Sequence, residues 1–135
     1  MKPKKIVLDG QHLTIDDMQR IVTDESVTVQ LAPSVAVVTK KAQQFIEKEL
    51  DKKIIYGVNT GVGPMAAHII GNSELHDLQV NLIRSHAVGM GEPIREEYVL
   101  AAMVVRLNTI SKGYSGVSYD LLRRLETFIN KRIIP

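Results

Sequence analysis

The sequence predicts a mainly α-helical protein, with short strands near its start and beside a glycine-rich loop at residues 56–63. Three stretches carry apolar residues at helical spacing, and a fourth is apolar throughout. Capping residues open several of these stretches, and glycines with a proline close one of them at residues 89–93. Aromatic residues make up only 4% of the chain and tryptophan is absent, so the core must be largely aliphatic. We expect one domain over residues 1–135.

The first half of the chain begins with a short predicted strand at residues 6–8. Thr14 is the expected N-cap of a first helix, because acidic residues follow it in the first turn. A second helix should open at Pro33-Ser34 and end near Leu50. Its apolar side chains follow helical spacing and form one stripe: Val35, Val38, Ala42, Phe45, Ile46 and Leu50.

The second half predicts three more helices. One begins at Ser73-Glu74 and stops in the glycine- and proline-containing residues 89–93. Another covers about residues 95–111, and its unbroken apolar run at 99–105 predicts a core position or a large helix–helix interface. Ser118 caps the last, whose apolar stripe is expected to be Leu121, Leu122, Leu125, Phe128 and Ile129.

Composition and charge exclude several classes of protein. Apolar residues make up 44% of the chain and charged residues 24%, as is ordinary for a globular domain. The net charge of +2 is small, and the basic residues of the chain are interleaved with acidic ones. We therefore expect neither a nucleic acid nor a membrane as partner. No apolar run is long enough for a signal peptide or a membrane span, and a cytoplasmic location is expected. The absence of cysteine excludes thiolate chemistry.

The octapeptide Tyr56-Gly57-Val58-Asn59-Thr60-Gly61-Val62-Gly63 is the most informative segment. Its three glycines allow backbone conformations that other residues avoid, and they leave N–H groups uncovered. A phenol on such a loop can meet a substrate and take part in acid–base chemistry. The segment could equally be a turn that Tyr56 anchors. It lacks the glycine spacing and the lysine of nucleotide-binding loops.

The four histidines, His12, His68, His76 and His86, match no short metal-binding spacing, so no metal site is expected. His86 stands apart because it lies at the end of a predicted helix, before a glycine-rich break. A side chain there is either structural or able to reach a cleft. Two further polar residues on the apolar helix, Arg106 and Asn108, are expected to be buried with structural partners, or else to lie at an interface.

Three ordered blocks together resemble one family, the aromatic amino-acid ammonia-lyases and aminomutases. The tyrosine loop is the first block. The second is Leu78-Gln79-Val80-Asn81-Leu82-Ile83-Arg84-Ser85-His86-Ala87 with Gly89-Met90-Gly91-Glu92-Pro93. The third is Arg106-Leu107-Asn108 with Lys112-Gly113-Tyr114-Ser115-Gly116-Val117. The similarity covers essentially the whole chain, and it implies the N-terminal part of the helical ammonia-lyase fold.

The resemblance also implies an activity: elimination of ammonia from an aromatic L-amino acid to give an α,β-unsaturated acid. Tyr56 would remove the β-proton, Gly63 would line the site near the substrate amine, and His86 would contact the substrate side chain. Ser85-His86-Ala87 looks more like histidine enzymes, whereas Gly63-Pro64-Met65-Ala66 and Arg106-Leu107-Asn108-Thr109 look more like tyrosine enzymes. Histidine is marginally preferred as substrate. Val62 departs from the family, which usually has phenylalanine there.

The family's electrophile, methylidene-imidazolone, forms from an Ala-Ser-Gly tripeptide that this chain lacks. The only Ser-Gly is Ser115-Gly116, which follows Tyr114 and belongs to the third block. In relatives the tripeptide follows shortly after the position of Pro135, so we expect the reading frame to continue. The 135 residues alone should be inactive, and the remainder of the chain and a homotetramer are expected partners. The alternative is a truncated, non-catalytic helical module that associates with a partner chain.

Overall fold

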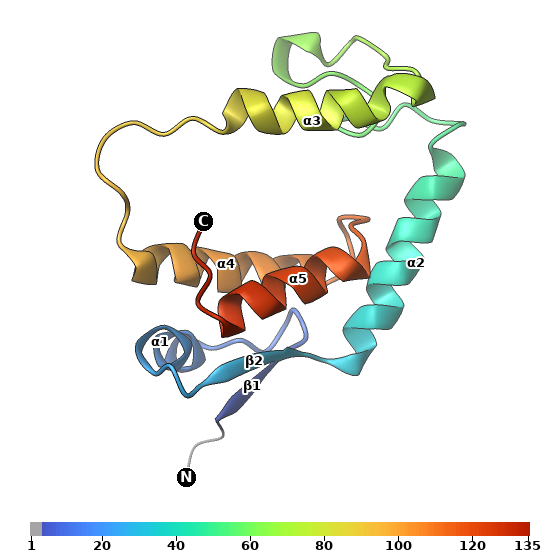
Figure 1. Ribbon diagram of the computed structural model, residues 1–135. Coiled ribbons are helices and arrows are strands. Elements are labelled where there is room, and N and C mark those ends of the chain that lie inside the picture. The colour runs from blue at the N-terminus through green and yellow to red at the C-terminus, as the bar shows by residue number, and fades with distance from the viewer. Residues whose placement is uncertain (1–3) are drawn as a thin grey trace. The chain divides into compact units, whose positions relative to one another are not determined.

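The computed structural model describes residues 4–135, and the chain divides into two compact units. The first unit is Met1–Ile46 with Pro93–Pro135, and the second unit is Glu47–Glu92. Figure 1 follows the elements in order. They are β1 (Lys5–Leu8), α1 (Ile15–Thr23), β2 (Thr28–Leu31), α2 (Pro33–Glu49), the 3₁₀ turns η1 (Gly63–Met65) and η2 (Asn72–Glu74), α3 (Leu75–His86), α4 (Glu96–Ile110) and α5 (Tyr119–Asn130). The predicted mainly helical fold is confirmed.

Strands β1 and β2 pair in parallel, and α1 is the crossover between them. Parallel strands need such a connection because the chain must return to the end at which it started. Side chains alternate along both strands, so that Ile6, Leu8, Val29 and Leu31 are buried. The sequence indicated the first strand but did not locate β2. Beside the tyrosine loop, the predicted extended structure is one antiparallel bridge.

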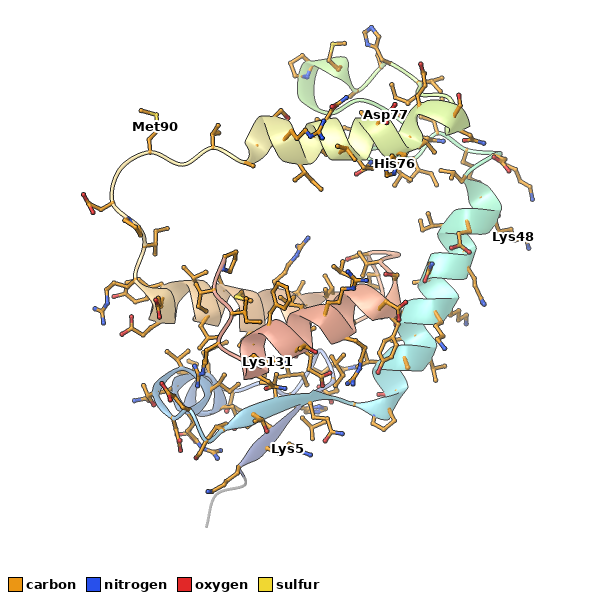
Figure 2. All side chains as sticks on the ribbon, in the orientation of Figure 1. Lys5, Lys48, His76, Asp77, Met90 and Lys131 are labelled. Carbon is orange, nitrogen blue, oxygen red and sulfur yellow. The ribbon has the colours of Figure 1, made fainter. Side chains whose placement is uncertain are left out.

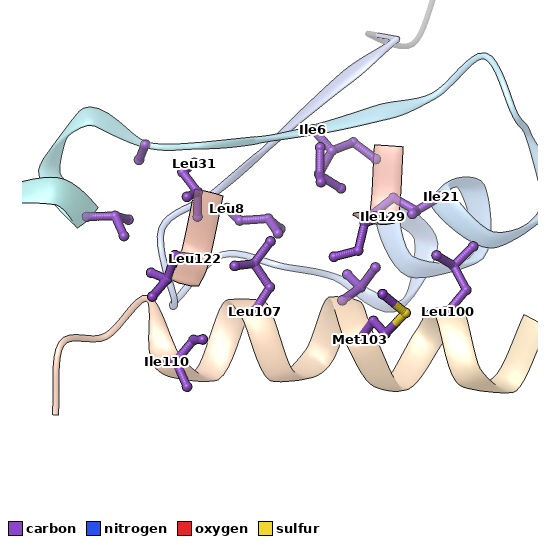
Figure 3. Close-up of a cluster of buried hydrophobic side chains, with 14 of the residues drawn as sticks. Ile6, Leu8, Ile21, Leu31, Leu100, Met103, Leu107, Ile110, Leu122 and Ile129 are labelled. Atoms are coloured by element: carbon purple, nitrogen blue, oxygen red, sulfur yellow. The ribbon is translucent and has the colours of Figure 1, made fainter. Parts of the chain in front are cut away.

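The apolar core lies in the first unit, between the β1–β2 pair and helices α1, α4 and α5 (Figure 3). Helix α4 contributes more of its residues than any other element, through Leu100, Met103, Val104, Leu107 and Ile110. The opposite side of α4 stays exposed: Val105 is 53% accessible although the sequence there is apolar. Across residues 4–135 no helix has the length and apolar character needed to cross a membrane.

Local signals placed the helix starts correctly. Thr14 caps α1 as predicted, since its Oγ1 accepts from the Asp17 N–H at 3.1 Å and Asp17 faces back towards the Thr14 N–H. Ser118 caps α5 through the Leu121 N–H. Asn108 is half-buried and accepts from the Gly10 N–H at 3.1 Å, as expected. Arg106 is exposed, so its predicted burial is wrong.

The apolar stripe predicted for α2 is mostly unburied. Only Val35 of that stripe is buried, while Phe45 remains 57% accessible. Thr39 is the second buried residue of α2, and its hydroxyl donates to the Val35 carbonyl at 2.7 Å. A threonine can lie in this apolar setting because its own helix satisfies its hydroxyl group.

Helix α5 covers the outer edge of β2 with polar side chains. Glu126 Oε1 accepts from the Leu31 N–H at 2.8 Å, and the Asn130 amide both accepts from the Val29 N–H and donates to the Val29 carbonyl. Glu126 and Asn130 are four residues apart and therefore share a helix face. With Glu126 turned towards β2, the buried residues of α5 are Leu122, Glu126 and Ile129. The predicted stripe is wrong for two residues, since Leu121 and Phe128 are exposed.

The end of α5 is tied to the end of α1. Arg132 adopts a positive φ of 53° directly after the helix, in the left-handed conformation common at helix ends. Its guanidinium donates to the carbonyls of Ile21, at 2.5 Å, Val22 and Asp24. These contacts satisfy carbonyls that a helix terminus leaves without an intrahelical partner.

Glu126 should be a major determinant of stability in the first unit. Glu126→Ala leaves the buried Leu31 N–H without its acceptor, which should lower the free energy of unfolding by about 1–3 kcal/mol. Glu126→Gln keeps an acceptor oxygen and should cost less. Urea denaturation measures both. Arg124→Ala, at an exposed position on the same helix, is the control. Equal stability of Glu126→Ala and the control would contradict the assigned role.

Asp9 closes a turn directly after β1. Its carboxylate accepts from His12 Nδ1 at 2.5 Å and from the N–H groups of Gln11 and His12 at 2.8 and 3.0 Å. The hydrogen bond from the His12 side chain, and then those from the two backbone N–H groups, lower the Asp9 pKa from 3.8 to about 2. A lowered pKa in the folded state means that the charged carboxylate stabilises the fold.

This stabilisation is fully present above pH 3.8, the value for the unfolded chain, and is lost as the pH falls towards 2. Asp9→Asn cannot titrate, so its unfolding free energy should fall less than that of the wild type over this range. Urea denaturation at a series of pH values measures the difference. Parallel stability curves for the two proteins would show that Asp9 does not supply it.

Candidate active site

The tyrosine loop lies in the second unit and begins just beyond α2. The backbone turns at residues 55–59, where the N–H groups of Val58 and Asn59 donate to the Ile55 carbonyl at 3.0 and 3.2 Å. Tyr56 lies in this turn, and its side chain is exposed, with 65% of the residue accessible. Gly57 follows at φ 73°, a conformation that glycine adopts without strain.

Tyr56 and Gly63, the two ends of the octapeptide, are joined by a hydrogen bond. The phenolic oxygen of Tyr56 accepts a hydrogen bond from the Gly63 N–H at 3.2 Å. Gly63 has a positive φ of 56°, and a Cβ built there would meet nothing within 4 Å. The backbone N–H therefore faces the phenol while the other side of Gly63 is open. The O–H proton of Tyr56 remains available for a second partner.

The rest of the loop folds back over itself. The Gly61 N–H donates to the His68 carbonyl at 3.0 Å, and the Ile70 N–H donates to the Asn59 carbonyl at 2.9 Å. Gly61 packs so closely that an added Cβ would lie 2.5 Å from the Met65 carbonyl oxygen. Only glycine fits at this position, which explains the second glycine of the octapeptide.

His86 is the last residue of α3 and is exposed. Its Nδ1 lies 2.8 Å from the Leu82 carbonyl oxygen and 3.1 Å from Ser85 Oγ. A carbonyl oxygen only accepts, so in the neutral ring Nδ1 carries the proton and Nε2 is the acceptor. Among the hydrogen bonds described for residues 4–135, none joins His86 to Tyr56 or Gly63. The structure thus orients the imidazole without pairing it with the phenol.

Two polar residues of the loop are important and were missed as site residues. Asn59 and Thr60 are 6% and 1% accessible, and both hold the loop through their side chains. Thr60 Oγ1 accepts from the Gly57 N–H at 3.1 Å and donates to the Gly61 carbonyl at 2.8 Å. Asparagine and threonine commonly bond to nearby backbone in turns, so their place between glycines was the available signal.

No metal centre is found in residues 4–135, where no three histidine, cysteine, aspartate or glutamate side chains cluster suitably. Ser115-Gly116, the only Ser-Gly pair, lies in the turn before α5, with Gly113 and Gly116 both at positive φ. Space there is tight, since a Cβ on Gly116 would lie 2.5 Å from Ile46 Cγ1.

Comparison with known proteins decides the family. The family model described as aromatic amino acid lyase matches residues 13–135. The chain belongs to this family. It corresponds to the N-terminal segment of the ammonia-lyases within it, which confirms the resemblance carried by the three sequence blocks.

Individual relatives agree with this assignment. Histidine ammonia-lyase from Staphylococcus aureus is 40% identical over 131 residues, which are 96% of this chain and 26% of the relative. Tyrosine aminomutase from Streptomyces globisporus superposes with a TM-score of 0.85 at 33% identity, covering 94% of this chain and 24% of that structure. Histidine ammonia-lyase from Trypanosoma cruzi gives 0.81 at 30% identity, covering 93% and 25%. The chain therefore spans about a quarter of the length of its relatives.

The fold of the loop predicts that Gly61 is intolerant of any side chain. Gly61→Ala places a Cβ against the Met65 carbonyl and should break the hydrogen bond from residue 61 to His68. Backbone amides of residues 57–63 should then exchange hydrogen faster, as measured by mass spectrometry. Gly89→Ala is the matched control in the same unit, because a Cβ there meets nothing within 4 Å. Unchanged exchange in Gly61→Ala would show that the loop tolerates the added group.

Proposed function

We propose that this chain is part of an enzyme that eliminates ammonia from an aromatic L-amino acid, with histidine marginally preferred over tyrosine. The observation that carries the proposal is the exposed phenol of Tyr56, held at 3.2 Å from the Gly63 N–H on a loop with buried anchors. Family membership supports the reaction class. We also propose a cytoplasmic location.

Tyr56 is the proposed base. It acts in its deprotonated form: the phenolate oxygen takes a proton from the β-carbon of the substrate and becomes a phenol, the electron pair of that C–H bond forms the Cα=Cβ double bond, and the C–N bond breaks with its electron pair leaving on the nitrogen as ammonia. The β-proton is weakly acidic, so the phenol must be held in one place relative to it. The hydrogen bond to Gly63 and the anchors beneath the loop supply this fixed position.

Gly63 and His86 are the proposed binding residues. Gly63 offers an open side, since nothing lies within 4 Å of where its Cβ would be, and the substrate amine can approach there. His86 presents Nε2 as an acceptor, because its Nδ1 is engaged by the Leu82 carbonyl. An imidazole N–H or a phenolic O–H is a suitable donor to that nitrogen. This chemistry fits histidine and tyrosine better than phenylalanine.

The electrophile must come from outside these residues. Methylidene-imidazolone, the family's cofactor, forms from Ala-Ser-Gly and activates the amino group for departure, but residues 1–135 contain no such tripeptide. Tyr114 stands before the only Ser-Gly pair. We propose that a segment encoded beyond Pro135 supplies the group, and that the 135 residues alone release no ammonia.

We further propose a homotetramer in which additional protein covers the second unit. All of residues 47–92 are described, and none of their apolar side chains is buried. Ile83 on α3 is 70% accessible, and Val88 and Met90, in the segment that follows, are 81% and 101% accessible. Figure 2 shows Met90 on this extended segment. Apolar side chains exposed together at this level are typical of protein–protein contacts.

The test is an assay of the protein expressed from the complete reading frame that contains these residues. Incubation with histidine, tyrosine and phenylalanine, followed by absorbance of the unsaturated acid, should show product with histidine exceeding product with tyrosine. Tyr56→Phe should lower kcat by at least about 100-fold, because a phenyl ring cannot accept the proton. Tyr114→Phe, at an exposed site in the first unit, is the control.

Four outcomes would contradict parts of the proposal. If none of the three amino acids gave an unsaturated acid, the proposed reaction would be excluded. Full activity of Tyr56→Phe would exclude Tyr56 as the base. Ammonia released by the purified 135-residue polypeptide would exclude an electrophile encoded beyond Pro135, and a stop codon directly after Pro135 would favour the non-catalytic module instead.

A further inference from the structure

The side chain of Asn59 makes three hydrogen bonds to backbone atoms at the base of the tyrosine loop. Its Oδ1 accepts from the Ile55 N–H at 2.7 Å, and its Nδ2 donates to the carbonyls of Lys53 at 2.8 Å and Leu50 at 3.1 Å. The residue is 6% accessible, so water cannot replace these partners. The amide therefore joins the segment that follows α2 to the turn at residues 55–59.

Tyr56 lies inside the turn that this amide closes. The residue before it, Ile55, donates to the Asn59 side chain, while the Asn59 backbone N–H donates to the Ile55 carbonyl. Both backbone polar groups of Ile55 are thus fixed by Asn59. These two bonds fix the direction of the backbone immediately before Tyr56. On the far side, the Asn59 carbonyl accepts from the Ile70 N–H and fixes the turn against the next part of the loop.

We propose that Asn59 is a positioning residue for catalysis: its buried amide holds the turn so that the Tyr56 phenol stays at the Gly63 N–H. This inference rests on the proposed function of Tyr56 as base. Asn59 touches no substrate. It acts through backbone geometry, and a shift of about 1 Å in a catalytic group can cost roughly 100-fold in rate.

The experiment uses the protein from the complete reading frame. Asn59→Ala removes all three hydrogen bonds and should lower kcat by about 100-fold while KM changes little. In the Tyr56→Phe background, Asn59→Ala should have almost no further effect, since no base remains to be positioned. Asn72→Ala is the matched control, because Asn72 donates to Asp51 Oδ1 at 2.6 Å in the same unit and should leave kcat unchanged.

Asn59→Asp separates positioning from general stability. The aspartate keeps an acceptor oxygen for the Ile55 N–H. Its second carboxylate oxygen replaces the Nδ2 donor and faces the Lys53 and Leu50 carbonyl oxygens, which repel it. When protonated, the carboxyl group regains one donor. The ratio of its kcat to the wild-type kcat should therefore rise as the pH is lowered, whereas the same ratio for Asn72→Ala should stay constant. A flat ratio for Asn59→Asp would overturn the assignment of its donors.

Hydrogen exchange gives a readout that does not require activity. Amides of residues 55–63 should exchange faster in Asn59→Ala than in the wild type, and the first unit should be unaffected. If the wild type releases no ammonia, the proposed function fails, and exchange still decides whether Asn59 holds the loop. Unchanged exchange, an unchanged kcat or an additive loss with Tyr56→Phe would each overturn the positioning role.

Discussion

Backbone N–H and C=O groups that are removed from water need hydrogen-bond partners, and in this chain side chains supply those that helices and strands leave unpaired. Glu126 and Asn130 complete the edge of β2, Arg132 completes the end of α1, and Asn59 completes the backbone beyond α2. Without these contacts the Leu31 and Val29 N–H groups of β2 and the Ile55 N–H before Tyr56 would lose the acceptors described for them. The architecture of both units depends on this one requirement.

The two units differ in what else stabilises them besides these hydrogen bonds. The first unit has an aliphatic core, and its side-chain-to-backbone bonds orient elements that the core already holds together. The second unit buries no apolar side chain, and its buried residues Asn59, Thr60 and Gly61 are polar or lack a side chain. The geometry of Tyr56 therefore depends on hydrogen bonds more than on packing. Directional bonds are well suited to holding one atom, the phenolic oxygen, in a defined place.

Sequence patterns predicted features that depend on near neighbours. Thr14 and Ser118 were recognised as caps because their partners lie three residues away. The stripe of α5 was wrong because the partner of Glu126 is Leu31, 95 residues distant, and helical spacing carries no information about it. Tyr56 and Gly63 were identified through the family resemblance and the glycine pattern. Asn59 was not predicted as a site residue: its place between glycines suggests a bond to nearby backbone, but the sequence does not show that its amide reaches Leu50, Lys53 and Ile55.

The same choice of partners has an evolutionary consequence. Asn59 bonds to main-chain atoms of Leu50, Lys53 and Ile55, and Thr60 bonds to those of Gly57 and Gly61. Replacing the side chains of Leu50, Lys53 or Ile55 leaves each of these anchors in place. Side chains around the loop can therefore change during evolution while the hydrogen bonds that shape the loop are kept. The sequence near Tyr56 can diverge without moving its phenol.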